Sequence, residues 1–226
     1  MCRLIGMGMV LGLGALATHG KPASARMARA WPDTMLARVE ALALIETLNA
    51  TLLASHSATT TLDQWCANHK LAEEPKIRAH RMPGMEKPVT AEQRERLRVG
   101  DAEPVKYRRV ELACGDHVLS EADNWYVPSR LSPETNRILE TTDIAFGRAV
   151  LDMKPIRRTF AVEILWKPLP DGWELAPPPP DSPGAELSIP WRLFQHRALV
   201  FGQDQLPFSE VSETYTSEIL AFGPPP

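Results

Sequence analysis

The chain has 226 residues, enough for one domain with a sizeable core. Its net charge of −3 and its 44% of apolar residues are close to the averages of soluble globular proteins. They argue against a general nucleic-acid binder, which would be basic. Proline is over-represented, with 21 residues, and runs at 177–180 and 224–226 predict stiff, exposed segments.

The first 25 residues have the pattern of a secretory signal peptide. Arg3 supplies a positive charge, an uncharged run extends from Leu4 to Leu16, and A-x-A motifs follow at 15–17 and 23–25. The apolar run is too short to span a membrane, and no later segment is long enough without charges. We therefore predict a signal peptide at 1–25, a mature domain at 26–226, and export, to the periplasm in a bacterium. A wrongly assigned start codon, which would make the protein cytoplasmic, and a buried N-terminal segment remain alternatives.

Hydrophobic periodicity predicts mainly helices in the first half of the chain. Apolar residues recur at steps of three and four after Asp33, as on one face of an amphipathic helix. Thr90 and Gln93 have the spacing of a capping box, which predicts a helix start. The expected elements are a helix at 33–54, a loop at 55–60, a helix at 61–70, a strand at 76–82 and a short charged helix from Thr90 through Arg98.

The second half of the chain is typical of an antiparallel sheet. Val110 and Leu112 alternate with charged residues, and Gly115 with Asp116 offers a turn, so a hairpin is expected through Val127. The further expected elements are a helix from Ser132 to about Glu140, strands at 156–166, 197–201 and 207–220, and a proline-rich exposed insertion or lid at about 167–190. Together they predict an α+β fold built on a single antiparallel sheet.

The sequence carries no strong enzyme or metal signature. Cys2, Cys66 and Cys114 form neither an even-numbered disulfide framework nor a zinc ribbon. Cys66 and His69 could share a helix face, but no second pair accompanies them, so we predict no metal site. P-loop, GxGxxG, GxSxG and HExxH motifs are absent. What remains are arginines in the strand-rich half, whose guanidinium groups can each hold a carboxylate with two hydrogen bonds.

Short motifs in a fixed order resemble chorismate pyruvate-lyase, whose fold is UTRA-like. They are Tyr107 to Leu112, the turn at 114–116, Ala122, Val127-Pro128, Phe146-Gly147-Arg148 and Arg158-Thr159-Phe160. The resemblance spans about Leu52 to Tyr215. It implies a sheet of about six antiparallel strands with flanking helices that form flaps over an enclosed pocket. It also implies conversion of chorismate to 4-hydroxybenzoate and pyruvate, a step toward ubiquinone, without a metal or organic cofactor.

The resemblance also implies site residues. The arginine that holds the ring carboxylate corresponds to Arg108, because Val110 and Leu112 then share its face of the strand. Arg109 is the runner-up. The catalytic glutamate corresponds to Glu213, with Glu210 as the runner-up. Burial near apolar groups would raise its proton affinity, which would suit it to hold the ring hydroxyl or to exchange a proton. A backbone amide contact falls on Phe146, and a methionine of the family falls on Ala58, where only a backbone contact is expected.

Two departures open an alternative function. The 167–190 insertion is longer than the family pattern, and export would take the protein away from the cytoplasm, where chorismate is made. The alternative is an exported, non-catalytic binder of a small aromatic carboxylic acid on the same fold, and a third reading is an envelope interaction protein. The expected partner is a small aromatic or cyclohexadiene carboxylate, with no nucleic acid and no stable membrane span, bound to a monomer.

Overall fold

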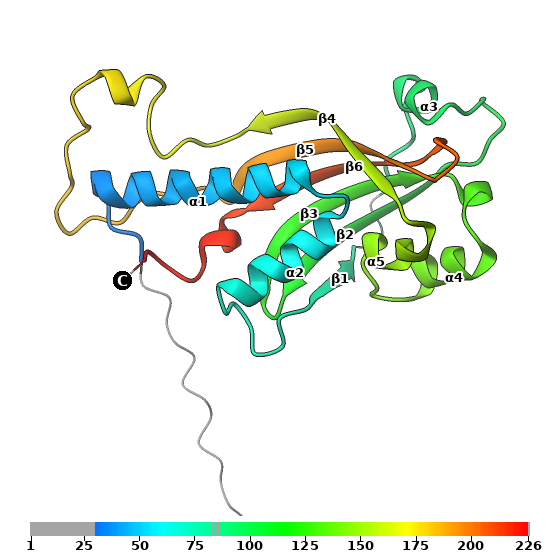
Figure 1. Ribbon diagram of the computed structural model, residues 1–226, viewed down its shortest axis with the longest axis horizontal. Helices are drawn as coiled ribbons and strands as arrows, with labels where there is room; N and C mark the ends of the chain where they lie inside the picture. The colour runs from blue at the N-terminus through cyan, green and yellow to red at the C-terminus, as the bar shows by residue number, and fades with distance from the viewer. Residues whose placement is uncertain (1–29, 83, 85, 226) are drawn as a thin grey trace, which may run out of the picture.

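The computed structural model describes residues 30–82, 84 and 86–225, so the predicted signal peptide lies outside the described residues (Figure 1). Six antiparallel strands form one sheet in the order β1-β2-β3-β6-β5-β4. The fold class is therefore confirmed as α+β with a single six-stranded antiparallel sheet. The strands are β1 (Ile77–Arg81), β2 (Lys106–Cys114), β3 (His117–Tyr126), β4 (Ile156–Ile164), β5 (Arg192–Phe201) and β6 (Pro207–Thr216).

In the described part of the chain, five α-helices accompany the sheet, and side-chain caps fix most of their starts. Thr34, Ser57, Thr90 and Ser132 each accept a hydrogen bond from a first-turn amide, and Thr90 forms the predicted capping box with Gln93. The helices are α1 (Met35–Ala54), α2 (Ala58–Asn68), α3 (Ala91–Leu97), α4 (Pro133–Thr141) and α5 (Phe146–Ala149).

Three sequence predictions of element boundaries were wrong. The loop expected at 55–60 ends early, because the Ser57 cap starts α2 at Ala58. Strand β5 begins at Arg192 rather than at 197, and β6 ends at Thr216, after which residues 217–220 form a 3₁₀ turn. The short helix α5 was not predicted, because four residues are too few for hydrophobic periodicity to register.

The helices cover the two faces of the sheet unequally. Helices α1, α2, α4 and α5 lie over one face (Figure 1). Buried α1 residues such as Ile45 and Leu48 belong to the same core cluster as Phe194 and Tyr215 of the sheet. The short α3 lies on the opposite face, where Gln93 donates a hydrogen bond to Glu210 of β6. The larger core, and any enclosed space, therefore lies on the face that carries four helices.

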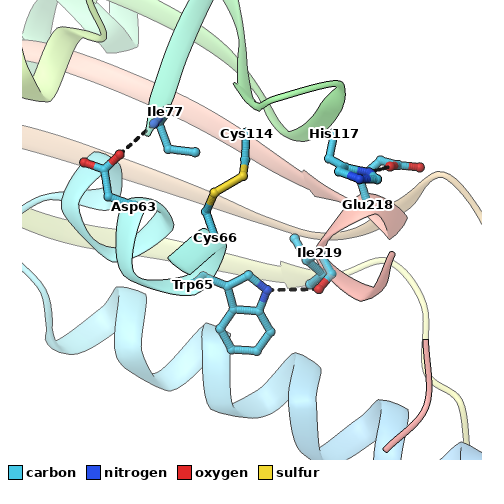
Figure 2. Close-up of a disulfide and its surroundings, with 8 residues drawn as sticks. All are labelled: Asp63, Trp65, Cys66, Ile77, Cys114, His117, Glu218 and Ile219. Atoms are coloured by element: carbon cyan, nitrogen blue, oxygen red, sulfur yellow. Dashed lines mark hydrogen bonds and ion pairs between the residues drawn. A yellow bond between two sulfur atoms is a disulfide. The ribbon is translucent and has the colours of Figure 1, made fainter. Parts of the chain in front are cut away.

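A disulfide bond ties α2 to the end of β2, which corrects the prediction that the cysteines have no such role. Cys66 and Cys114 are 48 residues apart in sequence, and their Cα atoms are separated by 6.1 Å (Figure 2). Trp65 donates a hydrogen bond to the carbonyl of Ile219, and Asp63 accepts one from the Ile77 amide, so contacts on both sides of the bridge hold the helix (Figure 2). The sequence does not reveal the pair because helix and strand meet only in the folded chain.

The 167–190 segment docks on the start of α1 and is not a lid over the sheet. The amide of Asp33 donates to the carbonyl of Ala185, and the amide of Leu187 donates to that of Trp31. In Figure 1 this segment runs beside the N-terminal end of α1, at the opposite end from the α1–α2 connection. Across the described part of the chain, no helix is both long and apolar enough to span a membrane.

Candidate functional site

A cavity lies between the four-helix face of the sheet and the starts of α2 and α5. The empty space measures about 600 Å³ when the solvent in its open mouth is included. Most of its wall is apolar. It is lined by His56, Ser57, Ala58, Thr59, Arg108, Val110, Leu112, Ala122, Asn124, Phe146, Gly147, Val150, Pro155, Arg157, Val200, Val211 and Glu213. The four residues that the resemblance implied, Ala58, Arg108, Phe146 and Glu213, are all among them.

Arg108 brings a buried positive charge to one end of the cavity. Its side chain projects from β2, the residue is 6% exposed, and Nη2 donates to the carbonyl of Ile144 at 3.0 Å. The Nε atom is buried without a hydrogen-bond partner, and no described carboxylate forms an ion pair with the group. Burial, reinforced by the like charge of Arg81, lowers the pKa of Arg108 to about 10. The guanidinium remains charged at neutral pH and has no counter-ion among the described residues.

Glu213 contributes a carboxylate that is already held by two partners. Arg157 Nη2 donates to Oε2 at 2.6 Å, and the Tyr215 hydroxyl donates to the same oxygen at 3.2 Å. The other oxygen, Oε1, has no hydrogen-bond partner among the described residues. Although burial opposes the charge of Arg157, attraction to Glu213 raises the pKa of the guanidinium. Glu213 is thus a carboxylate paired with Arg157, a partner that the sequence interpretation did not include.

Arg157 is the cavity residue that sequence reasoning missed. It lies on β4, one of the two edge strands of the sheet, and its side chain is only 4% exposed. A basic residue beside Arg158 gives no signal of burial. Its contact with Glu213 reaches across β5, which lies between β4 and β6 in the sheet. Local sequence patterns do not show which strands are neighbours.

The starts of two helices close the cavity on the side opposite the sheet. Ala58 is the first residue of α2 and Phe146 the first residue of α5. A Cβ atom on Gly147 would lie 2.9 Å from Thr59 Oγ1 and 3.1 Å from Ser57 Oγ. Glycine at 147 therefore permits α5 to approach α2 closely enough to form this wall.

The runners-up, Arg109 and Glu210, lie on the opposite face of the sheet. Arg109 forms ion pairs with Asp123 at 3.2 Å and Glu121 at 3.6 Å. Glu210 is 1% exposed beneath α3, where it accepts hydrogen bonds from Arg96 at 2.8 and 2.9 Å and from Arg197 at 3.3 Å. Neither lines the cavity, because residues an odd number apart on a strand face opposite ways.

A buried histidine lies beside Glu213 on the neighbouring strand β5. His196 is opposite Glu213 on β5, is fully buried, and shares a 2.8 Å hydrogen bond between Nε2 and Asn49 Oδ1. Burial lowers the pKa of His196 to about 4, with a contribution from the charge of Arg157. His196 is therefore neutral at pH 7, and its Nδ1 is buried without a partner.

Within residues 30–82, 84 and 86–225, no group of three or more His, Cys, Asp or Glu side chains is arranged to hold a metal ion. Cys66 is engaged in the disulfide, and His69 stacks on Phe222 with ring centroids 4.0 Å apart. The expectation that the protein works without a metal or organic cofactor stays a prediction.

No protein-family model matches the chain. The uncharacterized protein y4mC of Sinorhizobium fredii is 50% identical over 196 residues, which are 86% of this chain and 83% of that protein. The chain belongs to the y4mC family. Because y4mC is uncharacterized, this membership of the y4mC family assigns no activity.

Solved structures similar to this y4mC-family protein include domains of transcriptional regulators. The effector domain of PhnF from Mycobacterium smegmatis has a TM-score of 0.46 at 12% identity, over 72% of this chain and 90% of that chain. YydK of Bacillus subtilis, a possible transcriptional regulator, has a TM-score of 0.40 at 15% identity, over 63% and 59%. A GntR-family transcriptional regulator from Enterococcus faecalis has a TM-score of 0.39 at 10% identity, over 62% of this chain and 93% of that chain. These likenesses concern the fold alone.

Proposed function

We propose that the cavity binds a small carboxylic acid with a flat apolar body, of the hydroxybenzoate type. The observation that carries the proposal is the buried Arg108 guanidinium, which has no carboxylate partner in the described structure. An uncompensated buried charge is unfavourable, and a ligand carboxylate would relieve it with two parallel charge-assisted hydrogen bonds.

The space beside Arg108 suits an aromatic ring. Val110, Leu112, Ala122 and Val211 supply an apolar floor from three neighbouring strands, and Phe146 faces them from α5. A flat hydrocarbon body between these side chains would lose water-exposed apolar surface, which favours binding by about 25 cal/mol per Å².

The position of Glu213 on β6 supports a hydroxyl group on the far side of the ring. Arg108 is opposite Asn124, which is opposite Val211, and Glu213 follows two residues along β6. Strand spacing then separates the Cα atoms of Arg108 and Glu213 by about 12 Å, a span that two long side chains and one ring can fill. The unpartnered Oε1 of Glu213 is an acceptor for a hydroxyl proton.

The charges of the cavity favour a ligand with one negative charge. Arg108 and Arg157 are cations and Glu213 is an anion, so the three together carry one net positive charge. A monocarboxylate neutralises it, whereas a dicarboxylate would leave an excess negative charge in a largely apolar space.

Calorimetric titration of the purified protein tests this proposal. We expect 4-hydroxybenzoate to bind more tightly than benzoate, and 4-hydroxybenzamide, which lacks the charge, to bind much more weakly than either. Equal affinity for the acid and the amide would overturn the proposal, because the charge of Arg108 would then play no part.

The second candidate function is chorismate lyase activity, which the resemblance implies and which a carboxylate near the bound ring favours. The charge of the cavity counts against it, because chorismate carries two carboxylates. In that reaction the ether bond of chorismate breaks, the enolpyruvyl group leaves and becomes pyruvate, and the ring loses a proton to become 4-hydroxybenzoate. Glu213 Oε1 would receive or guide that proton. Incubation with chorismate, followed by assay of both products, tests the candidate, and appearance of neither product would reject it.

We also propose that the protein is exported. The 1–25 segment supports export, and the Cys66–Cys114 disulfide is a second, independent support. Disulfides persist in oxidising compartments such as the bacterial periplasm and are rare in the cytosol. Export in turn favours the binding function over the lyase.

A further inference from the structure

Asn124 is the polar neighbour of Arg108 in the wall of the cavity. The two residues are directly opposite each other on β2 and β3. Such cross-strand pairs have Cβ atoms about 5 Å apart and project to the same side of the sheet. Asn124 is 4% exposed and lines the same cavity as Arg108.

Ser209 fixes which end of the Asn124 amide faces the cavity. The Ser209 hydroxyl, fully buried on β6, donates to Asn124 Oδ1 at 2.6 Å. With the carbonyl oxygen engaged toward β6, the amide nitrogen Nδ2 is free to point elsewhere, and it has no hydrogen-bond partner among the described residues. Nδ2 is not among the fully buried polar atoms that lack a partner, so this donor keeps access to the cavity that Asn124 lines, and a ligand acceptor is its natural complement.

We infer that Asn124 is a ligand-binding residue, whose Nδ2 donates to the carboxylate that Arg108 holds. The inference rests on the proposed function. A carboxylate has about four acceptor positions, and one guanidinium occupies two of them. Asn124 supplies a third donor from the adjacent strand. Ser209, whose hydroxyl donates to Asn124 Oδ1, is a positioning residue.

This arrangement determines which chemical group of a ligand can bind beside Arg108. Two donors on neighbouring strands, Arg108 and Asn124, converge on one anionic group. Each also has one hydrogen bond within the protein, Arg108 to the Ile144 carbonyl and Asn124 with the Ser209 hydroxyl. A planar group with two acceptor oxygens satisfies them. A carboxamide presents a donor in place of one acceptor and leaves a protein donor unpaired.

Titrations of 4-hydroxybenzoate into three variants test the inference. Asn124→Leu keeps a similar volume and removes the donor, and we expect about 10- to 100-fold weaker binding, as for loss of a hydrogen bond to a charged group. Asn124→Asp places a carboxylate beside the ligand carboxylate and should weaken binding further. Ser209→Ala leaves the amide in place but frees its orientation, and an intermediate loss of about threefold to tenfold is expected.

The neutral ligand 4-methylphenol separates a direct contact from a structural effect. It has the ring and hydroxyl but no carboxylate, so Asn124→Leu should leave its affinity within about twofold of the unchanged protein. An equal loss for both ligands would mean that the substitution deforms the cavity, and it would overturn the inference.

Other outcomes distinguish this inference from the proposed function. If Arg108→Ala abolishes binding while both Asn124→Leu and Ser209→Ala retain full affinity, the inference is wrong and the proposed function stands. If the unchanged protein binds neither 4-hydroxybenzoate nor benzoate, the proposed function fails and the inference fails with it. Thermal unfolding of each variant, recorded without ligand, identifies any variant that does not fold, and Ser209→Ala then decides the question.

Discussion

The guanidinium groups of Arg108 and Arg109 lie on opposite faces of the sheet, although the two residues are adjacent in β2. Arg108 lines the cavity without a carboxylate partner, and Arg109 is paired with Asp123 and Glu121 on the other face. The charge of Arg108 on the cavity side therefore has no carboxylate partner in the described structure, whereas the charge of Arg109 on the other face is neutralised by its ion pairs.

This difference predicts unequal effects of two neighbouring substitutions on ligand binding. Truncating one partner of a buried charge pair typically costs about 2 to 5 kcal/mol, so Arg108→Ala should weaken 4-hydroxybenzoate binding by well over tenfold. Arg109→Ala removes the same charge outside the cavity and should change the binding free energy by less than about 0.5 kcal/mol. Calorimetry measures both. A larger loss of affinity in Arg109→Ala than in Arg108→Ala would assign the site to Arg109. If neither substitution weakened binding, the role that the resemblance to the lyase family implies for Arg108 would be wrong.

Two glutamates of β6 provide a second matched comparison. Glu213→Gln replaces the charged acceptor with a neutral one, and the preference for 4-hydroxybenzoate over benzoate should fall by about tenfold. Glu210→Gln perturbs the contacts with Arg96 and Arg197 beneath α3, so it should leave that preference unchanged while lowering the midpoint of thermal unfolding. A preference that survives in Glu213→Gln would show that Oε1 does not contact the ligand hydroxyl.

The sequence predicted features that depend on neighbouring residues. The alternation of Val110 and Leu112 predicted which face of β2 is covered, and the capping box at Thr90 predicted the start of α3. These features are local, because strand periodicity and helix caps involve residues within a few positions of one another.

The remaining features depend on contacts between distant segments. The Cys66–Cys114 bond joins residues 48 positions apart, and the ion pair between Arg157 and Glu213 spans an intervening strand. Asn124 had no signal of its own, since its place beside Arg108 follows from the hairpin register and its orientation from Ser209 on a third strand. Local patterns carry no information on such pairings.

The disulfide should make a large contribution to stability. Closing a loop of 48 residues removes chain entropy from the unfolded state, which corresponds to about 4 kcal/mol in the free energy of unfolding. Urea unfolding of the Cys66→Ser, Cys114→Ser double variant should reveal this loss. Dithiothreitol should lower the stability of the unchanged protein in the same way and have no effect on the variant. Equal stability of the unchanged protein with and without the reductant would contradict the prediction.

Export predicts the N-terminus of the protein recovered from its host. Signal peptidase cleavage at the A-x-A motifs would leave a chain that begins after Ala17 or Ala25. Mass spectrometry of the intact protein measures this directly, and thiol labelling of the same sample should find Cys66 and Cys114 oxidised. Recovery of a soluble cytoplasmic protein that retains Met1 or Cys2 would refute export.

His196 should make stability depend on pH below neutrality. Burial, together with the charge of Arg157, lowers the pKa of His196 to about 4 in the folded protein, against an ordinary value of 6.5 in the unfolded chain. As the pH falls from 6.5 toward 4, the unfolded state takes up a proton that the folded state does not. The free energy of unfolding therefore decreases, by up to about 1.4 kcal/mol per pH unit from this one group.

A variant without the imidazole isolates this contribution. His196→Gln can still donate a hydrogen bond to Asn49, and it removes the titrating group that the charges of Arg157 and Glu213 influence. Urea unfolding at pH 7 and pH 5 should show a smaller loss of stability in the variant than in the unchanged protein, even though the variant is less stable at pH 7. An identical pH dependence in the two proteins would mean that His196 takes up its proton equally in the folded and unfolded states.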